Sequence, residues 1–187
     1  MELGFAEYIW IDGTSPVQKL RSKSRVVRIT RGPEIGEWNF DGSSTNQAKG
    51  QDSECVLKPV RTVPDPTREG SYLVMCEVML PNGDPHPSNQ RAKLRAELED
   101  GGEELNTWWG FEQEYCLMDG KTDAILGWPD SVKFYPKPQG EFYCGAGCDE
   151  VVGREIVHEH AQACVDAGLL FYGHNAEVML GQWEFQT

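Results

Sequence analysis

The 187-residue sequence predicts an α+β protein, in which antiparallel strands and a few helices share one chain. Residues 5–80 read as short extended runs divided by turn residues, which is typical of a β-rich unit. Residues 150–167 instead carry apolar side chains at a helical period, and residues 175–186 contain two further extended runs. The predicted fold therefore combines a strand-rich first part with a mixed second part.

The extended runs of the first part are residues 6–12, 19–30, 37–40 and 72–80. The most strongly apolar of them ends at the turn sequence Pro81-Asn82-Gly83-Asp84-Pro85, whose proline and glycine residues favour a break in the chain. We expect a domain boundary there, so that residues 1–83 form one domain and residues 84–187 belong to a second.

The second part predicts two helices and three strands. Ser88 or Asn89 can cap a helix over residues 90–100, and a Gly-Gly pair follows it. Asp149 can cap a longer helix over residues 150–167, which Gly168 ends. Residues 109–118, 175–179 and 182–186 are expected to be strands.

Charge and composition exclude several classes of protein. The formal net charge is −13, whereas nucleic acids and anionic membranes attract clustered Lys and Arg. No apolar run approaches the roughly 18 residues of a membrane-spanning helix, and the first residues lack the basic and apolar blocks of a signal peptide. The six cysteines are scattered. We therefore expect a cytoplasmic protein that binds neither nucleic acid nor membrane.

Two glutamate pairs are the first candidates for a site. Glu112 and Glu114 are two residues apart, so on a strand they project from one face. If Leu180-Gly181 is a two-residue hairpin loop, Glu177 stands directly across from Glu184. Opposed carboxylates are unfavourable unless a cation lies between them or one is protonated. The pairs indicate a site for Mg²⁺ or Mn²⁺, with a solvated strand face as the alternative for the first pair.

Two other patterns favour ordinary structure. Cys144 and Cys148 have a spacing found in zinc sites, but His158 and His160 follow too closely to complete one. The glycine-rich run at residues 142–147 could hold a phosphate, yet Asp149 and its neighbour Glu150 place negative charge where the phosphate would bind. We interpret this run as a plain loop.

Several segments, in order and over nearly the whole chain, resemble glutamine synthetase of the eukaryotic-like class. The resemblance is carried by residues 6–14, 20–25, 38–45, 85–89, 110–115, 142–145 and 175–186, which include Trp38-Asn39-Phe40-Asp41-Gly42-Ser43-Ser44-Thr45 and Gly110-Phe111-Glu112-Gln113-Glu114-Tyr115. It implies a β-grasp-like N-terminal domain over residues 1–83, followed by the first part of the family's catalytic domain, an antiparallel sheet with helices, over residues 84–187.

The resemblance also implies a function, the ATP-dependent ligation of ammonia to glutamate through γ-glutamyl phosphate. Asp41 and Ser44 would be catalytic residues of a loop that binds ammonium. The implied metal ligands, for Mg²⁺ or Mn²⁺, are Glu112, Glu114, Glu177 and Glu184. The residues implied to border the nucleotide are Glu112, Glu184, Phe185 and Gln186. The family further implies a homo-oligomer of stacked rings, in which one subunit's N-terminal domain completes the next subunit's active site.

Family members continue well past the motif Gln182-Trp183-Glu184-Phe185-Gln186, so the resemblance implies a sequence truncated before the C-terminal half of the catalytic domain. We expect these 187 residues alone to be inactive. The alternative is a non-catalytic shortened homologue that co-assembles with, or regulates, a full-length synthetase.

Overall fold

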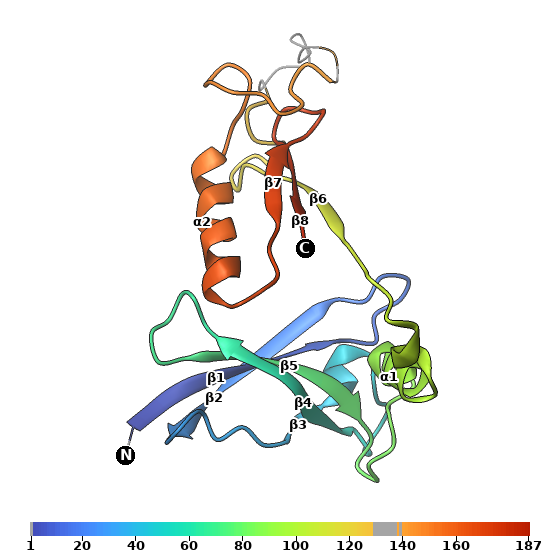
Figure 1. Ribbon diagram of the computed structural model, residues 1–187. Helices are drawn as coiled ribbons and strands as arrows, with labels where there is room; N and C mark the ends of the chain where they lie inside the picture. The colour runs from blue at the N-terminus through green and yellow to red at the C-terminus, as the bar shows by residue number, and fades with distance from the viewer. Residues whose placement is uncertain (1, 129–137, 139) are drawn as a thin grey trace. The chain divides into compact units, whose positions relative to one another are not determined.

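The computed structural model describes residues 2–128, 138 and 140–187 (Figure 1). Contacts within the chain divide it into two compact units, Met1–Thr107 and Trp108–Thr187. In the described part of the chain, no helix has both the length and the apolar character needed to cross a membrane.

The first unit is built on a five-stranded sheet with the order β2-β1-β5-β4-β3 (Figure 1). Its strands are β1 (Glu2–Ile11), β2 (Leu20–Ile29), β3 (Trp38–Asp41), β4 (Glu54–Pro64) and β5 (Tyr72–Met79). The first and last strands pair in parallel at the centre, whereas the other neighbours pair antiparallel. The sheet is therefore mixed, and the predicted α+β class with a β-grasp-like first domain is confirmed.

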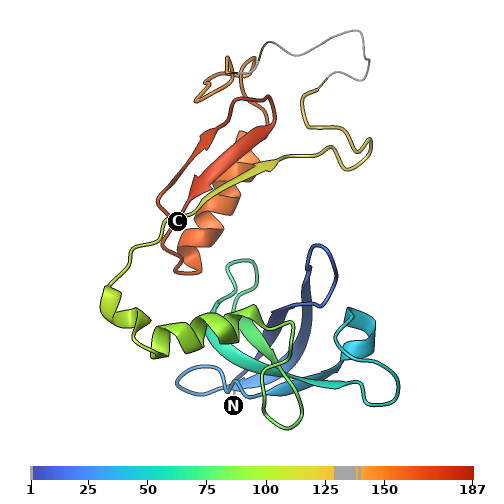
Figure 2. The same cartoon turned by 90° about the vertical axis from the view of Figure 1, so that its right-hand side faces the viewer.

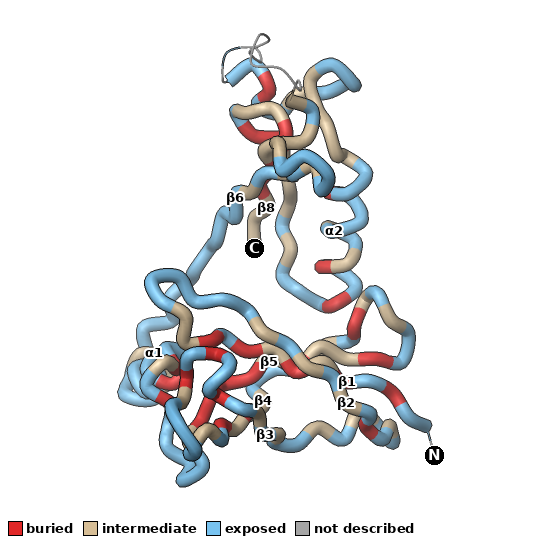
Figure 3. The backbone as a smooth tube through the Cα atoms, turned by 180° about the vertical axis from the view of Figure 1, so that it is seen from behind, coloured by how far each residue is buried: buried red, intermediate tan, exposed pale blue. Residues whose placement is uncertain are grey.

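One face of this sheet carries the core. Figure 3 colours the buried stretches along its strands. Ala6, Tyr8 and Trp10 alternate along β1 and are all buried, because side chains two apart on a strand project from the same face. They pack with buried residues of the neighbouring strands, namely Val27, Cys55, Leu57, Val74, Cys76 and Val78. Burial of this face fixes the register of the strands.

Sequence patterning did not indicate β4. The strand contains Pro59 and ends at Pro64, and proline lacks the N–H that a strand ladder needs. The structure accommodates this with a shift in register against β5 between Pro59 and Arg61. Pairing with β3 on one side and with β5 on the other therefore outweighs the low preference of this proline-containing segment for a strand.

Helix α1 (Gln90–Glu99) begins where the sequence predicts (Figure 2). Asn89 is the cap: its side-chain oxygen accepts from the Ala92 N–H at 3.0 Å, and its amide donates to the Val78 carbonyl. Arg95 pairs with the buried Glu77 of β5 at 2.7 Å. A short helical turn, η2 (Gly102–Leu105), follows. These contacts join α1 to the first unit, and the domain boundary after residue 83 stays a prediction about the family's domains.

The second unit has a three-stranded antiparallel sheet with the order β6-β8-β7. The strands are β6 (Glu112–Cys116), β7 (Gly173–Ala176) and β8 (Gln182–Gln186). Helix α2 (Arg154–Asp166) lies along one face of this sheet (Figure 1), where its Val157 is buried against Ala176 and Trp183. The opposite face is left free of helix α2.

Helix α2 starts four residues later than the sequence predicts, and Asp149 does not cap it. The residue before the first turn is Gly153, at a φ of 73°, a conformation that costs side-chain-bearing residues energy. A Cβ at this glycine would lie 2.2 Å from Cδ1 of Leu117. Close packing against Leu117 thus fixes the start of the helix, which a local capping rule does not take into account.

Candidate functional site

The predicted metal ligands share one face of the second sheet. Glu112 pairs with Gln186 across β6 and β8, and Glu114 pairs with Glu184. On the other side of β8, Asn175 of β7 also pairs with Glu184. Directly paired residues, and residues two apart, project from the same face. The face therefore carries Glu112, Glu114, Asn175, Glu177, Gln182, Glu184 and Gln186.

The predicted hairpin register is wrong by two residues. Glu177 does not stand across from Glu184; its N–H donates to the Gln182 carbonyl at 3.0 Å. The turn is wider than two residues because Gln182 N–H donates back to the Met179 carbonyl, which closes it around Gly181 at a φ of 83°. A shift of two residues keeps every side chain on its face, since the side-chain period of a strand is two.

The opposed pair in the structure is Glu114 with Glu184. Glu184 is 9% exposed and Glu177 is 8% exposed, whereas Glu112 and Glu114 are exposed. In the described residues, none of the ion pairs involves any of these four carboxylates. Burying carboxylates without a cation is unfavourable, so Glu177 and Glu184 point to a positive ligand.

Amide side chains hold these carboxylates in place. Gln182 donates from Nε2 to Oε2 of Glu114 at 2.6 Å, and Asn175 donates from Nδ2 to Oε1 of Glu177 at 3.2 Å. Gln186 donates to both Glu184 and Asn175. Because amides supply hydrogen bonds without charge, they orient the carboxylates and leave their negative charge uncompensated.

Tyr143 lies near the same face. The Cys144 thiol, followed by the carboxylates of Glu177 and Glu184, raises the pKa of this tyrosine above its usual range. Its hydroxyl therefore stays protonated at neutral pH and can serve as a donor. The sequence of this segment, interpreted as a plain loop, gave Tyr143 no role of its own.

The carboxylate and amide oxygens of this face suit a hard cation, but they do not form a complete metal site. Carboxylate and amide oxygens are the ligands that Mg²⁺ and Mn²⁺ prefer. In the part of the chain that the structure describes, no three His, Cys, Asp or Glu side chains stand close enough together to hold a metal ion. The same finding gives no support to the zinc alternative built on Cys144, Cys148, His158 and His160. A cation on the glutamate face would need oxygens from outside this set.

An apolar hollow of about 800 Å³ adjoins the glutamate face. Glu112 and Gln186, two of the residues predicted to border a nucleotide, line it. The rest of its wall is formed by Trp108, Trp109, Gly110, Phe111, Leu170, Phe171, Tyr172 and Thr187. The dipeptide Trp108-Trp109 was the available sequence signal, because two adjacent tryptophans outside a core pattern are unusual on a surface.

Phe185 takes a different position from the other predicted nucleotide residues. Its ring stacks on Phe171 with centroids 5.7 Å apart and lies 5.1 Å from the ring of His160 on α2. Alternation along β8 places this ring on the face toward the helix, opposite to Glu184 and Gln186. Its side chain therefore belongs to an aromatic cluster under α2.

Asp41 lies in the first unit, at the end of β3 and the start of the turn η1 (Gly42–Thr45). Its carboxylate accepts from both the Ser43 N–H, at 2.9 Å, and the Ser43 hydroxyl, at 2.6 Å. The Ser43 hydroxyl, then its N–H and the hydroxyl of Ser53 hold the pKa of Asp41 below its usual range. Ser44 is exposed on the same turn. The two predicted catalytic residues therefore lie together, with Asp41 ionised.

Comparison with known proteins indicates the family of the chain. The family described as glutamine synthetase, beta-Grasp domain, matches residues 2–81. A glutamine synthetase of Streptomyces hygroscopicus is 52% identical over 185 residues, covering 97% of this chain and 52% of the relative. A chloroplastic glutamine synthetase of Chlamydomonas reinhardtii is 46% identical over 192 residues, covering 97% and 50%.

A solved structure of Plasmodium falciparum glutamine synthetase has the same fold, with a TM-score of 0.64 at 14% identity, over 97% of this chain and 40% of that chain. The chain spans about half the length of the curated relatives it matches. With the matched domain, the relatives and the fold in agreement, the chain belongs to the glutamine synthetase family.

Proposed function

We propose that the chain is part of an enzyme that uses ATP to join ammonia to the side-chain carboxylate of glutamate, with Mg²⁺ or Mn²⁺ as cofactor. The observation that carries the proposal is the glutamate face, where Glu177 and Glu184 are buried without a cationic partner among the described residues and Glu114 lies across from Glu184. The relatives of this chain carry the name of that enzyme.

Glu112, Glu114, Glu177 and Glu184 would each supply a carboxylate ligand to a divalent cation. Because no three of the described His, Cys, Asp or Glu side chains cluster around one point, water or substrate phosphate would supply most of the ligands of any one ion. When bound, the cation would neutralise the negative charges that the phosphates of ATP and the glutamate carboxylate bring together. Gln182 and Gln186 orient the carboxylates for this role, since each donates to one of them. Tyr143 would donate to an oxygen at the edge of the face.

The apolar hollow would take the base of the nucleotide. Flat aromatic side chains offer stacking surfaces to a base, and Trp108, Phe111 and Tyr172 line the hollow. Glu112 and Gln186 lie on both the hollow and the glutamate face, so a base in the hollow would direct its phosphates toward the carboxylates.

Asp41 would bind ammonium and take its proton, so that the amine has a free lone pair for attack on γ-glutamyl phosphate. The lowered pKa of Asp41 keeps the carboxylate charged at neutral pH, which favours the attraction of the ammonium cation. The exposed hydroxyl of Ser44 on the same turn would add a hydrogen bond. We further propose that the enzyme acts as a homo-oligomer of stacked rings in the cytoplasm.

These 187 residues alone should not turn over, because phosphoryl transfer needs positive groups around the transferred phosphate. No lysine or arginine of the described residues forms an ion pair with the glutamate face. An assay with ATP, Mg²⁺, glutamate and ammonium should therefore give no glutamine above background. Turnover that Asp41→Ala abolishes would contradict this expectation.

The proposal itself is tested by binding of Mn²⁺ to the purified chain, followed by the electron paramagnetic resonance signal of the free ion. Glu184→Gln should weaken binding about tenfold or more, because affinity at oxygen sites follows ligand charge. The matched control is Glu159→Gln, which changes an exposed glutamate of α2. Equal affinity in both variants, or no saturable binding in the wild type, would remove the support for a cation on this face.

A further inference from the structure

The loop that carries Asp41 is closed by Gln47, a buried residue that is 6% exposed. The backbone N–H groups of Gln47 and Ala48 both donate to the carbonyl of Gly42, at 2.8 and 3.1 Å. Gly42 directly follows Asp41, so the Gly42–Ala48 loop is closed at the residue next to Asp41. Whatever holds Gln47 therefore holds the base of the turn on which Asp41 lies.

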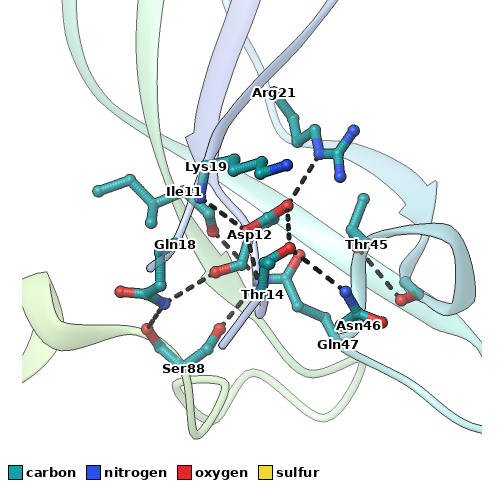
Figure 4. A network of polar contacts seen from close by, with 11 residues as sticks. Ile11, Asp12, Thr14, Gln18, Lys19, Arg21, Thr45, Asn46, Gln47 and Ser88 are labelled. Carbon is teal, nitrogen blue, oxygen red and sulfur yellow. Dashed lines mark hydrogen bonds and ion pairs between the residues drawn. The ribbon is translucent and has the colours of Figure 1, made fainter. Parts of the chain in front are cut away.

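One side of this loop rests on the end of β1 (Figure 4). Gly13 N–H donates to the Thr45 carbonyl at 2.9 Å, and the Gln47 side chain donates to the carbonyl of Ile11 at 3.2 Å. The same Nε2 donates to the hydroxyl of Ser88 at 2.9 Å. The loop is thus linked both to β1 and to the segment before α1.

The other side of the loop is held by His86, which is 8% exposed. Its Nε2 is hydrogen-bonded to the carbonyl oxygen of Gln47, and its Nδ1 lies 3.1 Å from the backbone N of Ser88 and 2.9 Å from the Ser88 hydroxyl. A carbonyl can only accept and a backbone N–H can only donate. The ring therefore has its proton on Nε2 and none on Nδ1, which is the neutral imidazole.

We propose that His86 is a positioning residue for Asp41, which holds the Gly42–Ala48 loop in place through its hydrogen bond to the Gln47 carbonyl. Without the imidazole, this carbonyl would lose its partner in a buried setting, which is unfavourable. The loop would then open, and the Asp41 carboxylate would no longer be fixed. The link to ammonium binding rests on the proposed function; the effect on the loop does not.

Hydrogen exchange followed by mass spectrometry tests the proposal on the full chain. At one fixed pH, exchange of the Gly42–Ala48 peptide should be about tenfold faster in His86→Ala than in the wild type, because the loop loses a hydrogen bond that keeps it closed. His86→Gln, whose amide can still donate to Gln47, should restore slow exchange.

The control variant is His158→Gln, which removes a histidine of α2 in the second unit and should leave exchange of the loop unchanged. A peptide from β2 reports whether any variant loosens the whole first unit. If His86→Ala does not fold, the ¹⁵N chemical shifts of the His86 ring in the wild type decide: they should show Nε2 protonated and Nδ1 unprotonated at pH 7.5.

Loop exchange in His86→Ala that matches the wild type, loop exchange in His86→Gln that is as fast as in His86→Ala, or an Nε2 without a proton would each overturn the proposal. The Mn²⁺ affinity of the glutamate face should be the same in all the His86 variants. Failure of the metal-binding test and failure of the loop test can therefore be told apart.

Discussion

Glu114 of β6 lies directly across from Glu184 of β8, and both side chains are carboxylates. Such a pair opposes folding of the sheet unless a cation is bound, because like charges directly across a strand pair repel. Each carboxylate also accepts from a glutamine amide, of Gln182 or of Gln186. Hydrogen bonds from uncharged amides thus hold the two carboxylates close together, although their repulsion makes the sheet less stable.

Glu114→Gln should stabilise the metal-free chain by about 0.5 kcal/mol, because the repulsion is lost while Gln182 keeps an acceptor. Added Mn²⁺ should raise the midpoint of thermal unfolding less in this variant than in the wild type, since ligand binding to the folded state stabilises it. Thermal unfolding with EDTA and with Mn²⁺ measures both effects. If Glu114→Gln and the exposed control Glu159→Gln respond alike, the pair has no part in cation binding.

His174 should make the second unit sensitive to acid. Burial, followed by the nearby His158, Arg154 and His160, lowers the pKa of His174 below its usual range, and its Nε2 is buried without a partner among the described residues. Because the folded pKa lies below the unfolded pKa, stability is constant above the ordinary histidine pKa and falls as the pH drops below it.

His174→Phe keeps a ring against Trp183, which now lies 6.3 Å away, and removes the titration. Unfolding followed by tryptophan fluorescence should show a smaller loss of stability between pH 7.5 and pH 5 in this variant than in the wild type. Parallel curves for the two proteins would show that His174 does not carry the acid sensitivity.

Asp12 is the most heavily hydrogen-bonded buried carboxylate of the first unit (Figure 4). It is fully buried and accepts from the N–H groups of Thr14 and Lys19, the Thr14 hydroxyl and Arg21 Nε. Burial opposes its ionisation, but these hydrogen bonds outweigh burial and hold the pKa of Asp12 far below its usual range.

Asp12→Asn should lower the free energy of unfolding by about 2–4 kcal/mol, because the amide N–H₂ group would face donors in a buried site. In the wild type, the stabilisation is present above the unfolded pKa of an aspartate and is lost as the pH falls through the lower folded pKa. Urea unfolding at pH 7 measures the change, with the exposed Asp52→Asn as control. A loss as small as that of the control would mean that the hydrogen bonds add little.

Ser43→Ala should raise the pKa of Asp41 toward its ordinary value, because the hydroxyl of Ser43 is the main group that lowers it. A ¹³C NMR titration of the Asp41 carboxyl carbon measures the shift directly. Ser44→Ala, on the exposed neighbour without a described bond to Asp41, serves as the control and should leave the titration unchanged. A larger shift in Ser44→Ala than in Ser43→Ala would contradict the described loop.

Local sequence patterns were sufficient to predict much of the fold. The turn residues around Gly83 end β5, Asn89 caps α1, and β8 runs over the predicted residues. In contrast, β4 was missed because Pro59 and Pro64 suggest a loop, and pairing on both sides decides its structure. The start of α2 was misplaced because the packing of Gly153 against Leu117 is a contact between distant residues.

The candidate site was also predictable only in part from the sequence. Alternation along β6 was enough to place Glu112 and Glu114 on one face, and the motif around Asp41 was enough to indicate the loop. The partner of Glu184 was not predictable, because it depends on a turn closed by contacts around Gly181 and on β6, which lies about 70 residues away in sequence. The role of His86 at Gln47 was equally hidden, 39 residues apart.

The sequence by itself determined the α+β class, the strand faces and the family, because side-chain period, turn residues and ordered motifs are local properties of the chain. Only the tertiary structure decided which carboxylates oppose each other, which are buried without a cation, and which side chains hold the Asp41 loop. These depend on strand register and on contacts between distant segments, which are set by packing of the whole unit rather than by neighbouring residues.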